Sequence, residues 1–307
     1  MEGRPSVSYW QDAWRRLKRN KVAMVSIYVI GAIFLFAFVG PLFFENDYST
    51  QIRGAENIAP CWEYPFGTDK LGRDMLLRTM YGTRISLTIG VTASVIVLVI
   101  GTVYGSVSGF LGGKVDAVMM RIVELIYSIP EILVVLLLQT VLKQPLQDWF
   151  NSSDSALAQA LAGVGPSLIS IYIAFGLLYW VGMARIIRGQ VLMLKEQEYV
   201  TAARALGASK GRIIRKHLWP NCIGQIIVTT CLQIPAAIFL ESFLSFLGVG
   251  VAPPMTSLGD MCSEALGGMY SYPYRLYIPA VLLSLMILSL NLFGDGLRDA
   301  LDPRLKK

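Results

Sequence analysis

This sequence of 307 residues contains few of the side chains from which soluble enzymes build active sites. Charged residues make up only 16% of the chain, and there is a single histidine, His217. One histidine cannot form a metal site by itself, and the four cysteines fall in no CxxC pair or other metal-ligand spacing. We therefore expect no metal site and no cofactor in this chain.

Catalytic motifs are also absent. The segment most similar to a phosphate-binding P-loop is SGFLGGKV at 108–115, which has Ser108 in place of the first glycine and Val115 in place of the Ser or Thr after the lysine. No GxSxG or HExxH motif occurs. The energy that this protein uses must therefore come from an ion gradient or from another polypeptide.

Hydrophobic residues make up 54% of the sequence, and charges avoid several windows of about 20 residues, the length that crosses a bilayer core. This pattern predicts an all-α membrane protein with six transmembrane helices. The expected spans are 22–44, 85–110, 122–142, 166–187, 222–247 and 276–293.

Basic residues indicate the orientation, because cytoplasmic flanks of spans are enriched in Lys and Arg. The tail before the first span, the 111–121 loop, the 185–216 region and the C-terminal tail hold 20 of the 27 Lys and Arg residues. Both termini are therefore expected in the cytoplasm. We interpret the net charge of +6 as a topology signal facing the lipid bilayer and expect no nucleic-acid partner. Cys61 and Cys262 both lie on the predicted outer side, so the sequence allows a disulfide between them without requiring one.

Several features within the spans predict packed helices. Gly101, Gly105 and Gly109 recur every four residues and place one side-chain-free face against a neighbouring helix. Pro130 and Pro235 interrupt the third and fifth spans, where each removes a backbone hydrogen bond and permits a kink.

Four acidic residues fall within or at the ends of spans, where an unpaired charge is costly. Asp295 is expected at the interface. Glu124 and Glu131 flank Pro130, and Glu241 lies toward the outer end of the fifth span. Glu241 is the best candidate to line a translocation pathway, and the alternative is a buried structural contact.

The segment 195–221 is polar and basic and lies between two long apolar stretches. Alanines favour a first helix, Gly207 ends it, Ser209 caps a second helix and Pro220 is expected to end that one. The result is a helix–break–helix elbow. Its basic residues could lie on the lipid surface, or Ala202 and Ala203 could form an apolar knob that enters a groove on a partner.

The elbow resembles the EAA loop of bacterial ABC importer permeases, whose form is Glu-Ala-Ala, three residues, Gly, nine residues, then Ile-x-Leu-Pro. The matching residues are Ala202, Ala203, Gly207 and Pro220, while Thr201 replaces the Glu and His217 and Trp219 replace the Ile and Leu. The form YVxAARxxGAS…HxxPN is similar to the oligopeptide and dipeptide branch, which commonly lacks that Glu.

Three further segments resemble the C-type subunit of that branch. They are FGTDKLGRD at 66–74 with the nearby Arg78, Gly82, Arg84, Ser86 and Leu87, FLGVGVAPPMTSLGDM at 246–261, and FGDGLRDALDPRLKK at the C-terminus. The resemblance implies a type I ABC importer permease fold. Residues 1–84 would comprise the N-terminal tail, first span and external loop, 85–296 the permease core with a coupling loop at 188–220, and 297–307 a cytoplasmic tail. We also expect the outer loop 45–84 to form an ordered cap.

The resemblance also implies partners and a role for the elbow. A homologous permease would complete the pathway, two cytoplasmic ATPases would bind ATP and Mg, and an extracytoplasmic binding protein would deliver dipeptides or oligopeptides at the bacterial inner membrane. Related systems carry nickel or glutathione. The residues implied to couple to the ATPases are Thr201, Ala202, Ala203, Arg204, Gly207 and Pro220. The alternatives are an ion-coupled secondary transporter of small solutes and a non-transport subunit of a membrane complex.

Overall fold

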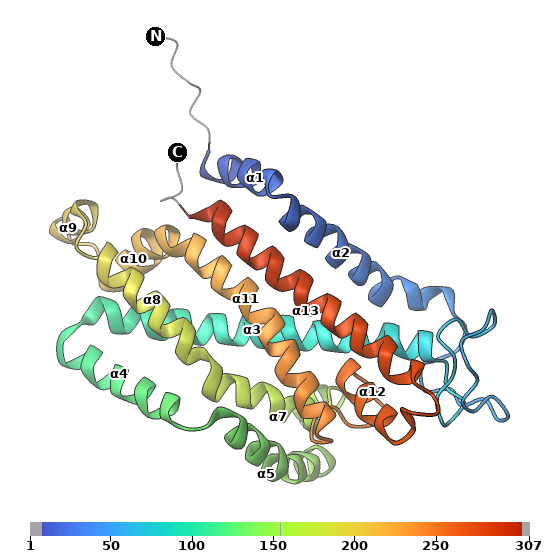
Figure 1. The fold of residues 1–307 in the computed structure, drawn as a ribbon. Coiled ribbons are helices and arrows are strands. Elements are labelled where there is room, and N and C mark those ends of the chain that lie inside the picture. The colour runs from blue at the N-terminus through green and yellow to red at the C-terminus, as the bar shows by residue number, and fades with distance from the viewer. Residues whose placement is uncertain (1–7, 154, 303–307) are drawn as a thin grey trace.

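The computed structural model describes residues 8–153 and 155–302, and the ordered elements of this part of the chain are helices. Residues 1–7 and 303–307, which belong to the predicted cytoplasmic tails, lie outside the described ranges. Figure 1 shows a bundle of long helices with shorter helices at its ends. The main helices are α1 (Tyr9–Arg19), α2 (Lys21–Phe38), α3 (Met75–Leu111), α4 (Gly113–Ser128), α5 (Glu131–Ser152), α7 (Pro166–Ala174), α8 (Trp180–Leu194), α11 (Trp219–Phe246) and α13 (Tyr274–Leu301).

Shorter elements connect these helices. They are η1 (Gly40–Phe43), α6 (Ala156–Ala162), the π-helical segments η2 (Phe175–Tyr179) and η3 (Ile214–Leu218), α9 (Glu198–Ala205), α10 (Lys210–Ile213), α12 (Leu258–Ala265) and η4 (Leu266–Gly268). In Figure 1, α1, α9 and the end of α13 lie at one end of the bundle, which we call the elbow end. The irregular segment 44–74 and α12 lie at the other, the loop end.

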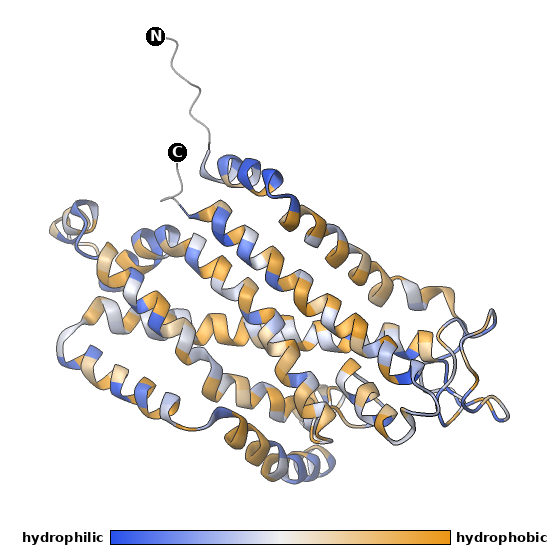
Figure 2. Ribbon diagram, in the orientation of Figure 1, coloured by the Kyte–Doolittle hydropathy of each residue, from blue (hydrophilic) through white to orange (hydrophobic). Residues whose placement is uncertain are grey.

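Among the described residues, five continuous helical stretches are long and apolar enough to cross a membrane, and a bent pair of helices completes six if it counts as one span. Apolar residues run along the length of these helices, and polar residues gather at the two ends of the bundle (Figure 2). The all-α, membrane-spanning architecture predicted from the apolar windows is therefore confirmed.

The third predicted span is a broken helix. Within it, α4 and α5 meet at an angle of 81°. The break lies at Ile129 and Pro130, which have extended backbone conformations, and Pro130 precedes α5 as its N-cap. A proline disfavours helical geometry at the residue before it, so Ile129 leaves the helix. The kink expected at Pro130 is thus a complete break.

Proline has little effect in the fifth span. Pro235 lies inside α11, which continues from Trp219 to Phe246. The expectation that Pro220 ends a second elbow helix is wrong, because α10, η3 and α11 form one helical stretch over Lys210–Phe246. Pro220 stands in the first turn of α11, directly after the π-helical segment. A proline within a helix lacks the N–H that would donate to the preceding turn, and the irregular π-helical segment η3 lies directly before α11.

The second span begins earlier than its apolar window. α3 starts at Met75, where the Asp74 carboxylate accepts a hydrogen bond from the Leu76 N–H at 2.7 Å. The added turns contain Arg78 and Thr79, which are buried against protein. A hydropathy window excludes such residues, although Arg78 is paired with Asp69 and Glu264 inside the molecule and the Thr79 hydroxyl donates to the Met75 carbonyl oxygen.

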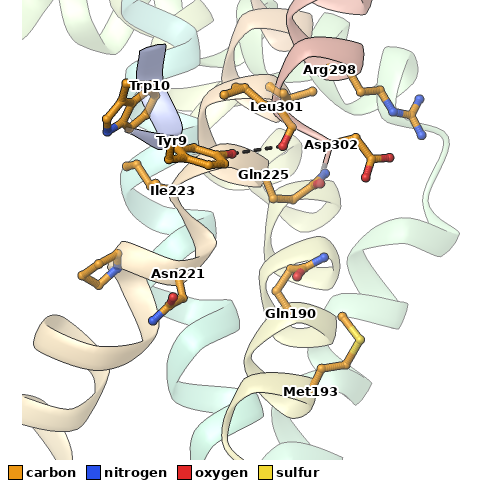
Figure 3. Close-up of a pocket in the computed structure, with 13 residues that line it drawn as sticks. Tyr9, Trp10, Gln190, Met193, Asn221, Ile223, Gln225, Arg298, Leu301 and Asp302 are labelled. Atoms are coloured by element: carbon orange, nitrogen blue, oxygen red, sulfur yellow. Dashed lines mark hydrogen bonds between the residues drawn. The ribbon is translucent and has the colours of Figure 1, made fainter. Parts of the chain in front are cut away.

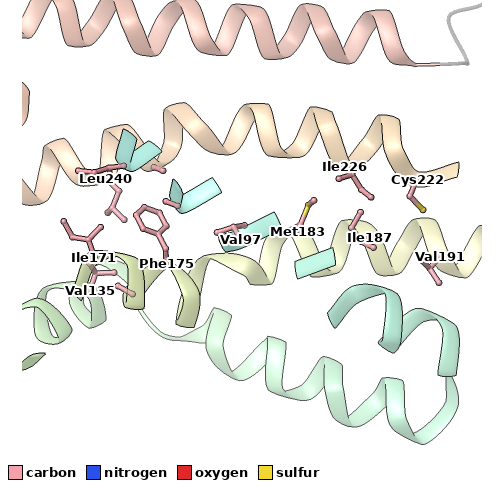
Figure 4. Packing of buried hydrophobic residues seen from close by; sticks show 14 of the residues in the cluster. Val97, Val135, Ile171, Phe175, Met183, Ile187, Val191, Cys222, Ile226 and Leu240 are labelled. Atoms are coloured by element: carbon pink, nitrogen blue, oxygen red, sulfur yellow. The ribbon is translucent and has the colours of Figure 1, made fainter. Parts of the chain in front are cut away.

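The main core lies between α3, α8, α7 and α11 (Figure 4). The predicted glycine seam is confirmed, because it forms the contact between α3 and α8. A Cβ added to Gly101 would lie 2.5 Å from the Met183 Cβ, and one added to Gly109 would lie 2.9 Å from the Arg188 carbonyl oxygen. The absence of side chains along this face therefore lets the two backbones approach closely.

Candidate functional site

The elbow residues project from the bundle on a single short helix. α9 (Glu198–Ala205) is followed by Gly207 at a φ of +79°, and the Ser209 hydroxyl then accepts a hydrogen bond from the Arg212 N–H at 3.4 Å. Glycine suits this positive φ because it has no Cβ. The helix–break–helix geometry expected for this segment is present.

One face of α9 is anchored and the other is open. Val200 is fully buried in the main core. The candidate coupling residues Thr201, Ala202, Arg204 and Gly207 are exposed, and Ala203 is half-buried. The neighbouring Leu206 is 88% exposed, which leaves an apolar side chain at the tip of the elbow. α9 therefore offers a small apolar knob rather than a buried packing face.

Pro220 lies apart from this surface. Together with Tyr9, Asn221, Gln225 and Arg298 it lines a cavity of about 770 Å³ between α1, α8, α11 and α13 (Figure 3). The structure therefore separates Pro220 from the α9 residues, with which the motif grouped it.

Basic side chains attach the elbow to the corner between α3 and α4. The Arg188 guanidinium donates to both carboxylate oxygens of Asp116, with N–O distances of 2.6 Å each. The Lys195 ammonium donates to the Gly109 carbonyl oxygen at 3.0 Å. The Arg204 guanidinium lies 5.9 Å from the centre of the Phe110 ring. We call these three contacts the elbow clamp.

The clamp matters because α4 has few other polar attachments. The Ser108 hydroxyl also donates to Asp116, at 2.5 Å, and the Tyr104 hydroxyl donates to the Met119 carbonyl oxygen at 2.8 Å. The exposed pair Arg121 and Glu124 lies on the surface of the same helix. Asp116 therefore joins α4 to the elbow side of α8, beside the apolar cluster of Val123 with Val181 and Ala184.

A second polar cluster lies at the loop end. The Arg78 guanidinium donates to Asp69 at 2.6 Å and to Glu264 at 2.7 Å, and it reaches the Thr256 hydroxyl at 3.2 Å. Arg73 binds the same two carboxylates, at 2.6 Å to Asp69 and 3.0 Å to Glu264. We call this cluster the outer network. It joins the loop, the start of α3 and α12.

The electrostatics of the outer network follow from burial and ion pairing. Burial raises the pKa of Asp69 and Glu264, but the Arg78 and Arg73 charges together with hydrogen bonds outweigh it and hold both pKa values below their usual range. Burial and the nearby Glu264 carboxylate raise the pKa of Asp260 to about 6. Asp260 is thus the member of this group that titrates in the mildly acidic range.

The outer loop is ordered by its own hydrogen bonds, as expected for 45–84. The Thr68 hydroxyl accepts from the Ile58 N–H at 2.8 Å, and the Tyr274 hydroxyl donates to the Thr68 carbonyl oxygen at 2.8 Å. The Arg275 guanidinium donates to Asn57 at 2.9 Å. The loop therefore packs onto the start of α13.

Two cysteines flank this region without pairing. Cys61 is exposed on the loop and Cys262 is buried on α12, and both are free thiols. The disulfide that the sequence allowed between Cys61 and Cys262 is therefore not formed.

Glu241, the candidate pathway residue, is buried within the described part of the chain. Its side chain is fully buried on α11 and accepts hydrogen bonds from Ser86 at 3.1 Å and Ser245 at 2.7 Å. Ser245 in turn accepts from the Val251 N–H at 3.1 Å. The carboxylate thus joins α3, α11 and the following turn, which is the structural alternative considered for it. A buried carboxylate needs such donors because its desolvation is costly.

The other acidic residues of the spans form no internal relay. Glu124 is paired with Arg121 at 2.9 Å and is exposed, as are Glu131 and Asp295. The exposed position of Asp295 agrees with the expected interfacial placement. Nothing among the described carboxylates links Glu124, Glu131 and Glu241 into a chain of proton carriers.

Sequence reasoning missed both clusters. Asp69, Arg73 and Arg78 belong to the segment that carried the family resemblance, but nothing in the sequence pointed to Glu264 as their common partner. Nothing in the sequence indicated that Asp116 and Arg188 form a pair, because 72 positions separate them.

Comparison with known proteins adds an independent finding. Residues 101–307 match the family model described as binding-protein-dependent transport system inner membrane component. Residues 8–60 match the N-terminal transmembrane domain of oligopeptide transport permease C.

Similar proteins of known type cover almost the whole chain. The dipeptide transport system permease protein DppC of Bacillus subtilis is 46% identical over 305 residues, which is 99% of this chain and 88% of the relative. The oligopeptide transport system permease protein OppC of the same organism is 44% identical, covering 98% and 92%. OppC of Escherichia coli K12 is 42% identical, covering 99% and 93%.

Proposed function

Because this chain belongs to the family of binding-protein-dependent transport system inner membrane components, we propose that it forms part of a peptide pathway and that α9 couples it to ATPase partners. It is a multi-pass inner-membrane permease component, and such components lack ATPase activity of their own. The family description implies a binding protein and ATPase partners. The two B. subtilis relatives are named for dipeptides and oligopeptides, which supports peptides as the substrate class.

The observation that carries the coupling proposal is the open face of α9. A helix of eight residues exposes Thr201, Ala202 and Arg204, is followed by the exposed Leu206, and is fixed to the bundle through Val200. An exposed apolar knob on a rigid mount suits insertion into a groove of a partner protein. We assign the groove to an ATPase subunit and the elbow end, with both termini, to the cytoplasm.

The proposed mechanism is a population shift. Two ATPases that dimerise on ATP move α9, and the elbow clamp passes this movement through Asp116 to α4 and the broken third span. ATP then favours an outward-facing arrangement with a homologous permease, because it binds the two arrangements with different affinity. Hydrolysis and product release return the pair to an inward-facing state, and the peptide leaves into the cytoplasm.

Reconstitution tests this function. Proteoliposomes with both permeases, both ATPases and the binding protein are expected to accumulate labelled dipeptide with ATP, and to do so equally with and without an uncoupler. Omitting either the ATPases or the binding protein should abolish accumulation. Accumulation by this chain alone on a proton gradient would contradict the proposal and favour an ion-coupled transporter.

A further inference from the structure

The N-terminal helix α1 has three distinct faces. Its inner face carries Ala13 and Leu17, which are 7% and 4% exposed. Ala13 packs near Val228 and Leu301, and Leu17 packs near Ala300. α1 is therefore fixed against the ends of α11 and α13.

Two hydrogen bonds hold the same inner face in place. The Tyr9 hydroxyl donates to the Leu301 carbonyl oxygen at 3.0 Å, and Figure 3 shows Tyr9 reaching toward Leu301. The Arg16 guanidinium lies 3.5 Å from the Asp302 carbonyl oxygen and 2.8 Å from the Asp12 carboxylate. Arg16 and Asp12 thus neutralise each other within the contact.

The second face is aromatic and basic. Trp10, Trp14 and Lys18 follow one another at four-residue intervals, so they lie on one side of the helix. Both tryptophans are 50% exposed, and the Lys18 ammonium lies 5.2 Å from the centre of the Trp14 ring. The described part of the chain therefore leaves about half of each tryptophan side chain uncovered.

The third face carries Arg15 and Arg19, which are also four residues apart and exposed. With Lys18 and the exposed Lys21 at the start of α2, α1 presents four cations outside its ion pair, and its single acidic residue is Asp12. The exposed side of α1 is therefore strongly positive.

The position of α1 limits what can cover it. One residue, Asn20, separates α1 from α2, and α2 is a candidate membrane span. α1 must therefore lie where that span enters the bilayer. Tryptophan combines an apolar ring with a polar N–H and concentrates at the membrane–water interface. Lys and Arg at this depth attract anionic lipid.

We propose that α1 is an interfacial anchor that binds anionic phospholipid headgroups. Trp10 and Trp14 insert at the level of the headgroups, and Arg15, Lys18, Arg19 and Lys21 contact lipid phosphates. The inner face connects this lipid contact to the ends of α11 and α13. The anchor is independent of the transported solute. An acidic protein surface is the competing occupant, but Figure 1 places α1 apart from α9, the candidate ATPase contact.

Depth-dependent fluorescence quenching tests the insertion. The complete transporter is placed in nanodiscs made with lipids brominated either near the glycerol or at the chain end. The fluorescence of Trp14 is obtained by subtracting the fluorescence of the Trp14→Phe variant from that of the native chain. We expect stronger quenching of that signal by bromines near the glycerol, in nanodiscs that contain phosphatidylglycerol. Trp14 fluorescence that no brominated lipid quenches would overturn the anchor.

A charge-neutral variant tests the lipid specificity. The triple variant Arg15→Gln, Lys18→Gln and Arg19→Gln should need a several-fold higher phosphatidylglycerol content to reach half of the change in Trp14 quenching. Each cation adds to the attraction between α1 and anionic lipid. Lys70→Gln, at an exposed cation of the outer loop, is the control and should change nothing. Equal quenching in purely zwitterionic lipid, or a crosslink from Trp14 to an ATPase subunit, would overturn the proposal.

Discussion

Arg188 on α8 and Asp116 on α4 form a bidentate ion pair, with two nitrogen–oxygen distances of 2.6 Å. Arg188 lies six positions before Leu194, the end of α8, and α9 begins four positions after Leu194. The pair therefore lies at the base of the elbow and links α8 to the broken third span. Bidentate Arg–carboxylate pairs fix orientation as well as distance.

We predict that breaking this pair uncouples transport. Asp116→Asn or Arg188→Gln should lower ATP-driven uptake several-fold, while the ATPases still copurify with the permeases. The half-buried pair should contribute about 1–3 kcal/mol, because each change leaves a charged partner without its bond. Arg121→Gln on the same helix breaks an exposed pair and should leave uptake unchanged. Normal uptake in both clamp variants would exclude the pair from coupling.

Gly207 should be sensitive to any β-branched residue. Its φ of +79° lies in a region that such residues avoid, at a cost of about 1–2 kcal/mol. Gly207→Val should leave the protein inserted in the membrane but lower uptake and weaken ATPase copurification. Gly211, which is also exposed and has open space around its Cα, provides the control, and Gly211→Ala should behave like the native chain. Equal behaviour of the two variants would argue against a special elbow geometry.

Charge at the elbow gives a separate prediction. Ala203→Asp places a carboxylate on the half-buried side of the knob, and Arg204→Glu reverses the cation that lies over Phe110. Both should lower uptake and ATPase copurification, since the partner groove is expected to receive small apolar side chains. Membrane insertion and the melting temperature of the permease pair should stay near native values. Native ATPase copurification and uptake in both variants would remove α9 from the docking role.

The outer network predicts an opposite response to pH at two of its carboxylates. Asp260 has a pKa raised from 3.8 to about 6, so its charged form is disfavoured in the folded state. The resulting loss of stability is absent below about pH 4 and complete above about pH 6. Asp260→Asn should therefore raise the melting temperature at pH 8 but not at pH 4, by the equivalent of about 1–2 kcal/mol after solvent screening.

Asp69 supplies the contrasting case. Burial raises its pKa, but the Arg78 and Arg73 charges and two backbone hydrogen bonds together lower it by more. Its contribution to stability is therefore present at neutral pH and disappears as the pH falls below about 4. Asp69→Asn should therefore lower the melting temperature at pH 8, where Asp260→Asn raises it. A shift of the same sign for both variants would contradict the charge arrangement of the outer network. The exposed Asp299, on α13, is the control position.

Glu241 should act through stability and not through proton transfer. Glu241→Ala leaves the Ser86 and Ser245 hydroxyls without their acceptor and should cost about 1–3 kcal/mol in unfolding free energy. Glu241→Gln keeps an acceptor oxygen and should be milder. Uptake by either variant should remain insensitive to an uncoupler when ATP is held constant. Loss of uptake in Glu241→Gln at native stability would indicate a direct role in transport.

Apolar windows and residue propensities predicted the helical class and the elbow because both depend on local sequence. The break after Gly207 and the cap at Ser209 are local backbone effects, and the glycine seam on α3 is a helical repeat. The 81° break in the third span was only partly visible, since a proline in a span either kinks or ends the helix according to what surrounds it. The early start of α3 was hidden by buried polar residues.

Long-range pairs were not predictable from the sequence. Arg78 and Glu264 lie 186 positions apart, and Asp116 and Arg188 lie 72 apart. A single sequence contains no information that pairs such charges, because each of them is also compatible with a solvated surface. The same limit applied to Glu241, which accepts a hydrogen bond from Ser86 on another helix, 155 positions away.

The most direct test of the account is to identify what touches α9 in the membrane. A photoreactive residue in place of Ala202, in cells that carry the whole transporter, should give a crosslink to an ATPase subunit, stronger with ATP bound. The same residue at Leu71, an exposed site in the outer loop, should give no such product. Crosslinks to an ATPase from position 202 would establish the coupling surface. Robust peptide uptake with no ATPase crosslink from position 202 would contradict it.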